Sequence, residues 1–353
     1  MLLCFYNIFH DFDIDIDTIK RIISIDCLVY AFLIIIPFIT GTDFPSYNWA
    51  FSGTTGWFYA ANEIGAILVM TAVCILYFMD NTNKKKILLA IPIIYAISLM
   101  GTKVCFIGII AIVAVVSIIF ILRTQKDPYV LPGLLFVMLI VASLNSSAVK
   151  NMNTLSNIDT LPPLTTETET ETEGSTEIVI VPETEDIADS TETKDPYLRE
   201  PEEDVEMSKV IRANKFLYAI NRITSKRLLY LMQNFPFFVE NGLPTLLFGL
   251  GWAPRTAIEY TYYRPLIEID IFDILLHYGI LGFGVYFTPF IYLGYKLIRH
   301  IKDVPFEAWA HIFSVVLGFG ISCIAGHVLG APSVSTFVIL LMILAMKQIQ
   351  HEK

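Results

Sequence analysis

The stretch Val104–Leu122, VCFIGIIAIVAVVSIIFIL, decides the fold of this chain. It contains no charged residue and is rich in Ile, Val and Phe throughout, so it has no polar face to turn toward water. A helix needs about 20 mostly apolar residues to cross the hydrocarbon core of a bilayer. The stretch therefore predicts a membrane-spanning helix.

Similar charge-free runs occur on both sides of this one. In chain order they are Cys27–Thr42, Ile64–Met79, Ile87–Thr102, Pro128–Val149, Ile274–Tyr295 and Ala308–Met346. The last run is too long for one helix, and the sequence GAPS at Gly330–Ser333 supplies a turn in its middle. We expect an all-α fold, a polytopic transmembrane helix bundle of about eight spans.

The composition agrees with a membrane protein and excludes an ordinary soluble domain. The 353 residues are 55% hydrophobic and 16% charged, with a mean hydropathy of +0.61. The net charge of -10 is local, because 165–207 holds sixteen acidic and two basic residues and the remainder carries +4. The five cysteines are scattered and form no disulfide framework or metal-binding pattern. The lipid bilayer is an expected partner, and nucleic acid is not.

The basic residues predict the orientation of the spans, since Lys and Arg near span ends favour the cytoplasm. The clusters are Lys20/Arg21, Lys84–Lys86, Arg123/Lys126, Lys296/Arg299/Lys302 and Lys347/Lys353. With eight spans and both termini cytoplasmic, every cluster falls on the inner side. The arrangement places a large loop, from Asn145 to about Ile267, outside.

Four regions follow from these patterns. Residues 1–149 form an N-terminal region of five spans, and 268–353 form a C-terminal region of three. Residues 150–207 include Thr-Glu alternation from Thr165 and are too acidic to bury a core, so we expect a disordered insertion. It is a solvated spacer or, alternatively, a carrier of O-linked sugars. Residues 208–267 are basic and aromatic with helical spacing, which predicts an ordered, cationic helical loop near the outer face.

Four short motifs carry a family resemblance. They are GTTGWFYAANEIGA from Gly53, MGTKVCFIGI from Met100, TSKRLLYLMQNFPFF from Thr224 followed by LLFGLGW from Leu246, and IEIDIFDILLHYGILGFGVYF from Ile267. In order and spacing they resemble the O-antigen ligase and Wzy polymerase family. The resemblance covers most of the chain from Gly53 onward.

The resemblance implies a glycosyltransferase of the bacterial cytoplasmic membrane. Its donor would be a polyprenyl-diphosphate-linked glycan, and its acceptor a second glycan or a lipid. It implies no cofactor and no metal, and the dispersed histidines and carboxylates show no ligand spacing. Polymerase and ligase activities both remain open.

The chain departs from the family at two places. Many members open the closing helix with His-Asn where this chain has Glu268 and Ile269, which implies an acidic variant. Members also usually carry several more spans, so we expect spans before Cys27 to be missing. A shortened, inactive paralogue is therefore an alternative, as is a transporter or flippase for polyprenyl lipids, although no internal repeat supports the latter.

The proposed chemistry needs cations for the diphosphate. Arg227, Arg255 and Arg264 lie on the outer loop, and guanidinium forks suit phosphates. Arg227 also lies in one of the motifs. For Arg255 and Arg264, the alternative to binding the diphosphate is pairing with loop carboxylates or lipid headgroups. Lys103 opens a span from outside and is expected to contact a phosphate or to snorkel.

The acceptor hydroxyl needs a base. Motif alignment favours Glu268 and geometry favours Asp270, because on a regular helix Asp270, Asp273 and His277 form one polar stripe into the membrane. Asp273 and His277 are thus candidate lining residues of the glycan cavity.

Asn62 and Glu63, at the outer end of the second span, are further candidates for the cavity lining. Helix capping or an interhelical bond is the alternative role for both.

Overall fold

A computed structural model describes most of the chain. The described residues are 15–46, 52–80, 84–123, 128–144, 146–151, 209–211, 213–224, 227–251, 267–300, 302, 304–324, 326 and 328–351. The expected insertion at 150–207 lies outside them apart from Lys150 and Asn151, and Arg255 and Arg264 lie outside them too.

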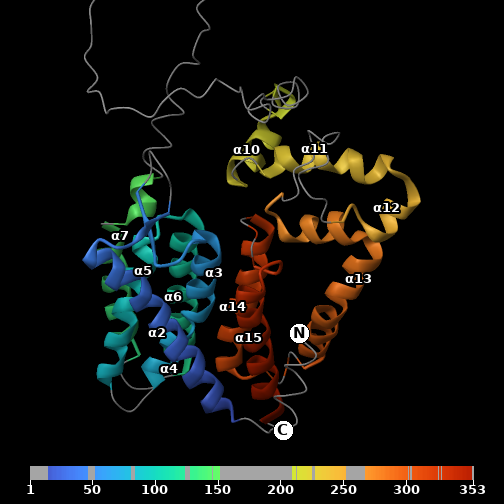
Figure 1. Ribbon diagram of the computed structural model, residues 1–353. Coiled ribbons are helices and arrows are strands. Elements are labelled where there is room, and N and C mark those ends of the chain that lie inside the picture. The colour runs from blue at the N-terminus through green and yellow to red at the C-terminus, as the bar shows by residue number, and fades with distance from the viewer. Residues whose placement is uncertain are drawn as a thin grey trace, which may run out of the picture.

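The described chain is almost entirely helical (Figure 1). In chain order the elements are α2 (Ile16–Thr40), β1 (Phe44–Pro45), β2 (Thr54–Gly56), α3 (Ala61–Thr71), α4 (Cys74–Asp80), η1 (Lys84–Leu89), α5 (Ala90–Leu99), α6 (Lys103–Arg123), α7 (Val130–Leu144), α10 (Lys215–Ile223), α11 (Arg227–Glu240), α12 (Gly242–Phe248), α13 (Asp270–Arg299), α14 (Phe306–Ile324) and α15 (Pro332–His351). The strands β1 and β2 form one small antiparallel ladder.

Six described helical segments are long and apolar enough to cross a membrane. They are α2, α3 continued by α4, α6, α13, α14 and α15. Two shorter apolar helices, Lys86–Leu99 and Val130–Leu144, occupy the other two predicted positions. The prediction of an all-α polytopic bundle is confirmed, while the four domain boundaries stay predictions.

Helix α3 lies at the centre of the bundle, and every residue of Ile64–Thr71 is buried. It packs against α2, α6, α14 and α15. Small residues permit the close contacts: a Cβ on Gly108 of α6 would lie 2.5 Å from Val69 Cγ1, and one on Gly318 of α14 would lie 2.4 Å from Met70 Sδ. Glycines at such crossings let apolar helices approach and gain dispersion contacts.

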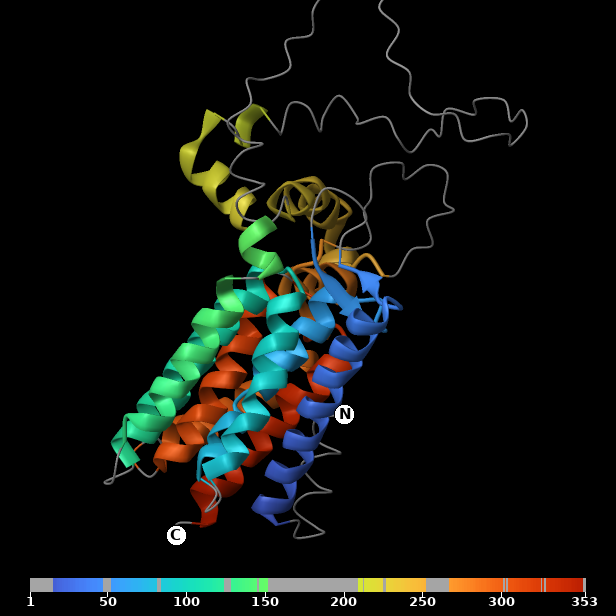
Figure 2. The same ribbon diagram turned by 90° about the vertical axis from the view of Figure 1, so that its left-hand side faces the viewer.

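The short helices α10–α12 lie across one end of the bundle, above the spans (Figures 1 and 2). Their sequence alternates exposed apolar residues such as Phe216 and Phe248 with polar ones. The region expected to be an ordered helical loop therefore contains these helices, which cap the end where the site described below lies.

Helix α13 is sharply bent at Gly279, where φ is 67° and ψ is -176°. Its first part runs beneath α11, and the remainder descends beside the bundle (Figure 1). Asp270, Asp273 and His277 are buried and all precede this bend, so they share one helical segment of α13, and their arrangement as a stripe into the membrane stays a prediction.

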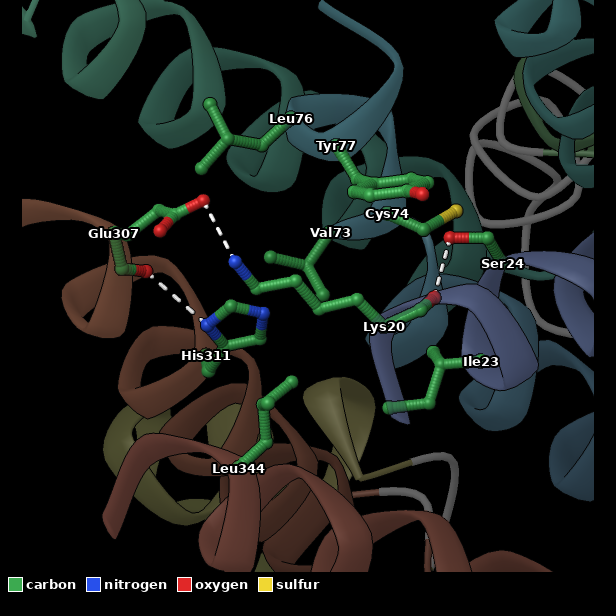
Figure 3. A pocket seen from close by; sticks show the side chains of 10 residues that line it. All are labelled: Lys20, Ile23, Ser24, Val73, Cys74, Leu76, Tyr77, Glu307, His311 and Leu344. Carbon is green, nitrogen blue, oxygen red and sulfur yellow. Dashed lines mark hydrogen bonds and ion pairs between the residues drawn. The ribbon is translucent and has the colours of Figure 1, made fainter. Parts of the chain in front are cut away.

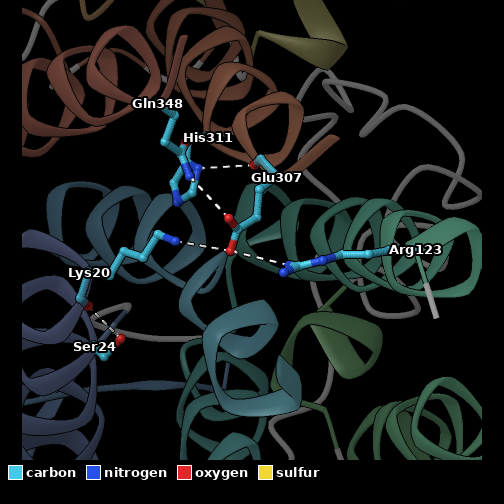
Figure 4. A network of polar contacts seen from close by, with 6 residues as sticks. All are labelled: Lys20, Ser24, Arg123, Glu307, His311 and Gln348. Carbon is cyan, nitrogen blue, oxygen red and sulfur yellow. Dashed lines mark hydrogen bonds and ion pairs between the residues drawn. The ribbon is translucent and has the colours of Figure 1, made fainter. Parts of the chain in front are cut away.

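A polar network joins four spans at the opposite end of the bundle. A cavity of about 10 Å³ lies there, lined among others by Lys20, Tyr77, Glu307 and His311 (Figure 3). Glu307 Oε1 lies 3.0 Å from Lys20 Nζ and 3.4 Å from an Arg123 guanidinium nitrogen (Figure 4). The carboxylate of α14 thus links α2 and α6.

Two further contacts complete this network. His311 Nδ1 lies 3.1 Å from the Glu307 carbonyl oxygen, and Gln348 Nε2 on α15 donates to Glu307 Oε2 at 3.5 Å. The cavity is too small for a substrate, so the network's evident role is to hold the spans together.

Candidate functional site

A glycine turn after α12 docks on the bend of α13. The Leu250 amide donates to the Leu276 carbonyl at 2.7 Å, and the Gly251 amide donates to the His277 carbonyl at 3.1 Å. A Cβ on Gly249 would lie 2.2 Å from the His277 carbonyl oxygen, and one on Gly279 would lie 2.4 Å from the Leu247 carbonyl group. Both positions have positive φ, 87° and 67°, which L side chains rarely adopt. The two glycines therefore permit backbone-to-backbone contact that fixes the start of α13.

An arginine and a glutamate meet next to this docked turn. Arg227, the first residue of α11, donates from Nη2 and Nε to Glu268 Oε2 at 2.7 and 3.1 Å. A third bond, 3.4 Å long, runs from Nη1 to the Ile324 carbonyl at the end of α14. Arg227 is 8% exposed, so its charge is held in one place by these contacts.

Glu268 itself has an unusual backbone. Its φ of 63° makes it the one non-glycine residue of the described chain with a positive φ. Its carbonyl lies against Gly326, where an added Cβ would be 2.3 Å from the oxygen. Non-glycine residues in this conformation cost about 1 to 3 kcal/mol and gather at functional sites. The strain is consistent with a segment held for a purpose other than stability.

Two carboxylates at the start of α13 bind backbone amides. Asp270 Oδ2 accepts from the amides of Val328 and Leu329, both at 2.7 Å, which ties α13 to the α14–α15 connection. Asp273 Oδ1 accepts from the Ile267 amide at 2.7 Å, which fixes the segment that leads into α13. His277 Nδ1 lies 2.7 Å from the Asp273 carbonyl oxygen.

A cavity of about 340 Å³ opens beside these carboxylates. The residues lining it come from α3, α13 and the α14–α15 connection with the start of α15: Glu63, Asp270, Asp273, Ile274, Tyr278, Tyr286, Leu329, Gly330, Ala331, Pro332 and Ser333. Two hydrogen bonds connect the elements that line it. Ser333 Oγ donates to Glu63 Oε2 at 3.3 Å, and Tyr286 Oη donates to the Leu329 carbonyl at 2.5 Å. The volume is at the lower end of the about 300 to 1,000 Å³ of small-molecule sites.

Some of the predicted site residues line the cavity, and others lie elsewhere. Glu63, Asp270 and Asp273 line the cavity, and Arg227 pairs with Glu268 near the loop that Asp270 binds. The other described candidates, Asn62, Lys103 and His277, do not line the cavity. Arg255 and Arg264 lie outside the described residues.

Sequence reasoning missed several lining residues. Neither the motifs nor the charge pattern points to Tyr278, Tyr286 or Ser333, and the sequence around Gly330 indicates only a turn, although the structure places it in the cavity wall. A tyrosine inside an apolar run was the available signal for Tyr286, because its hydroxyl needs a partner when it leaves water.

No group of three or more His, Cys, Asp or Glu side chains in the described ranges is arranged to hold a metal ion. The expectation of a metal-independent reaction stays a prediction.

Fold and site together define a multi-pass membrane protein with a polar, carboxylate-lined cavity at one end of its bundle, beneath a cap of short helices. The chain matches the family described as "O-antigen ligase like membrane protein" over residues 1–352, and it belongs to that family. The resemblance carried by the four motifs is thereby confirmed. No curated protein and no solved structure matches the chain.

Proposed function

We propose that this protein is a glycosyltransferase of extracytoplasmic glycan assembly in the bacterial cytoplasmic membrane. It moves a glycan from a polyprenyl diphosphate onto a second glycan or another acceptor, without a metal or cofactor. The observation that carries the proposal is the held arginine, Arg227, close to a cavity lined by Asp270, Asp273 and Glu63. Family membership supports the same class of reaction.

The arginine suits the leaving group. As the bond between the sugar and the diphosphate breaks, negative charge grows on the departing phosphate oxygen and needs fixed donors. Glu268 orients the Arg227 guanidinium before the substrate arrives. When the diphosphate binds, it would share this guanidinium with Glu268. Arg255, Arg264 and Lys103 are the further candidate phosphate contacts.

A carboxylate suits the attacking group. The acceptor hydroxyl oxygen forms the new bond to the anomeric carbon, its proton passes to the base, and the polyprenyl diphosphate leaves. Asp270 lines the cavity, whereas Glu268 pairs with Arg227 and is not among the lining residues. Geometry therefore supports Asp270 over Glu268 as the base, with Asp273 and Glu63 as further cavity carboxylates.

Substituting Arg227 tests the proposal. In vesicles with polyprenyl-diphosphate-linked repeat units and an acceptor glycan, we expect Arg227→Ala to lower the transfer rate by about 10² to 10³, the usual cost of losing one charge-stabilising donor. Arg227→Lys keeps the charge but not the fork and should recover only part of the rate. Asp270→Asn should also lose transfer. Product is measured by gel separation of labelled glycan.

Two matched controls accompany these variants. Arg21→Ala removes an exposed arginine at the other end of the bundle, and Glu240→Gln removes an exposed carboxylate of α11. Both should transfer at the wild-type rate. If the Arg227→Ala variant transfers glycan at the wild-type rate, Arg227 does not belong to the site. A folded wild type that is inert with several donors would favour the inactive paralogue, and movement of the lipid without transfer would favour a flippase.

The proposed orientation has its own test. Tyr59, 93% exposed near the capped end, and Lys302, exposed at the other end, are replaced singly by cysteine in a chain with Cys4 and Cys323 changed to serine. A membrane-impermeant maleimide should label Tyr59→Cys in intact cells and Lys302→Cys only after permeabilisation. The reverse pattern would place the capped end in the cytoplasm and rule out an extracytoplasmic site.

A further inference from the structure

The cavity between α3, α13 and the start of α15 has charge of one sign on its walls. Among its lining residues three are carboxylates, Glu63, Asp270 and Asp273, and none is Lys, Arg or His. The nearby guanidinium of Arg227 points instead to Glu268 and to the Ile324 carbonyl. The cation of Arg227 therefore lies outside the cavity, in an ion pair with Glu268, and the charged side chains that line the cavity are all acidic.

Two of these three carboxylates are buried and held in place. Asp270 is 4% exposed and Asp273 is 8% exposed, so water screens them little. Asp270 is tied on one oxygen by the Val328 and Leu329 amides and Asp273 by the Ile267 amide, so neither can swing away from an entering ligand. An anion placed in the cavity would meet fixed carboxylates and lose its own hydration.

The remaining walls suit a sugar ring. Tyr278 and Tyr286 offer flat apolar faces with hydroxyls at their tips, and Tyr278 is 45% exposed. Carboxylates accept hydrogen bonds from several hydroxyl or amine donors at once, and Ser333 adds a hydroxyl. The volume of about 340 Å³ fits a short saccharide rather than a long chain.

We propose that this cavity binds the acceptor sugar and discriminates by charge, taking neutral or amine-bearing sugars and excluding those with a carboxylate or phosphate. The inference rests on the proposed function, since it assigns the acceptor to the cavity. It also places the donor diphosphate on the Arg227 side, outside the acidic walls. Exclusion by fixed like charge is an established way to set specificity.

A pair of acceptors that differ only in charge provides the test. One is a neutral hexose trisaccharide, and the other has its terminal hexose oxidised to a hexuronic acid. Protein in vesicles of neutral phospholipid is given the same donor with each acceptor. The neutral acceptor should have a kcat/KM at least about tenfold higher, and raising the salt concentration should change this ratio little, because buried charges are poorly screened by salt.

Glu63→Gln makes the test specific to the cavity. Glu63 is half-buried, and a glutamine oxygen can still accept the hydrogen bond from Ser333, so the fold should persist. Removing one of the three charges should reduce the preference for the neutral acceptor several-fold, mainly by improving use of the acidic one. Glu240→Gln, a carboxylate on α11 outside the cavity, should leave the preference unchanged.

Binding separates failure of this inference from failure of the proposed function. Titration calorimetry of both trisaccharides with protein in neutral nanodiscs requires no transfer. Tighter binding of the neutral sugar, reduced by Glu63→Gln, supports the selective cavity even if no donor is used, in which case only the transferase proposal fails. The inference is overturned if the two sugars are used or bound equally, or if Glu63→Gln leaves the preference unchanged. The proposal that Arg227 takes part in transfer would still stand.

Discussion

Replacing Gly279 with alanine is expected to reduce transfer by about 10²-fold, because it shifts the start of α13 away from its docked position. A Cβ at this position would lie 2.4 Å from the Leu247 carbonyl group and 2.5 Å from the Gly249 amide nitrogen. These are backbone atoms, so no side chain can rotate to make room. The φ of 67° with ψ of -176° is in addition a conformation that only glycine adopts readily.

The measurement is the initial transfer rate together with the apparent melting temperature of the purified protein. Gly284→Ala is the matched control on the same helix, since an added Cβ there meets no atom within 4 Å. Alanine in a helix is favoured over glycine by about 0.5 to 1 kcal/mol, so this control should melt no lower than wild type. Full activity in Gly279→Ala would show that the docked turn is not needed for the reaction.

The spans could be predicted from sequence because a charge-free run of sufficient length has few alternatives to a membrane helix. The boundaries were less predictable. The first run begins at Cys27, but α2 begins at Ile16 and includes four charged residues, Asp17, Lys20, Arg21 and Asp26. Lys20 is accommodated because Glu307, far away in the chain, supplies its counter-charge. A local pattern cannot reveal that partner.

The candidate site shows a similar limit. Motif alignment favours Arg227 and Glu268, and helical geometry favours Asp270. Neither predicts the pairing of Arg227 with Glu268, which depends on how α11 and α12 dock on α13. That docking depends on the bend at Gly279. The segment from His277 to Gly284 holds three glycines, and only contact with the turn at Gly249 distinguishes the first of them. Tertiary contact, rather than local propensity, determines the geometry of the site.

Replacing Glu307 with glutamine is expected to cause the largest loss of stability at the other end of the bundle. The substitution leaves Lys20, whose side chain is 11% exposed, next to Arg123 with no carboxylate between them. Breaking a fully buried ion pair costs about 3 to 5 kcal/mol, and the partial exposure here lowers the expectation to about 2 to 3 kcal/mol. Thermal unfolding in detergent measures it, with transfer at the distant site as a check on the native state.

Two companion variants show whether charge is the cause. Arg123→Gln removes the more exposed cation, whose side chain is 47% exposed, and should cost less than about 1 kcal/mol. The double variant Lys20→Met with Glu307→Gln removes both members of the buried pair and should recover most of the loss, because an apolar replacement leaves no charge to desolvate. A double variant as unstable as Glu307→Gln alone would contradict this explanation. The hydrogen bond between Gln348 and Glu307, rather than the charge of Glu307, would then be what joins these spans.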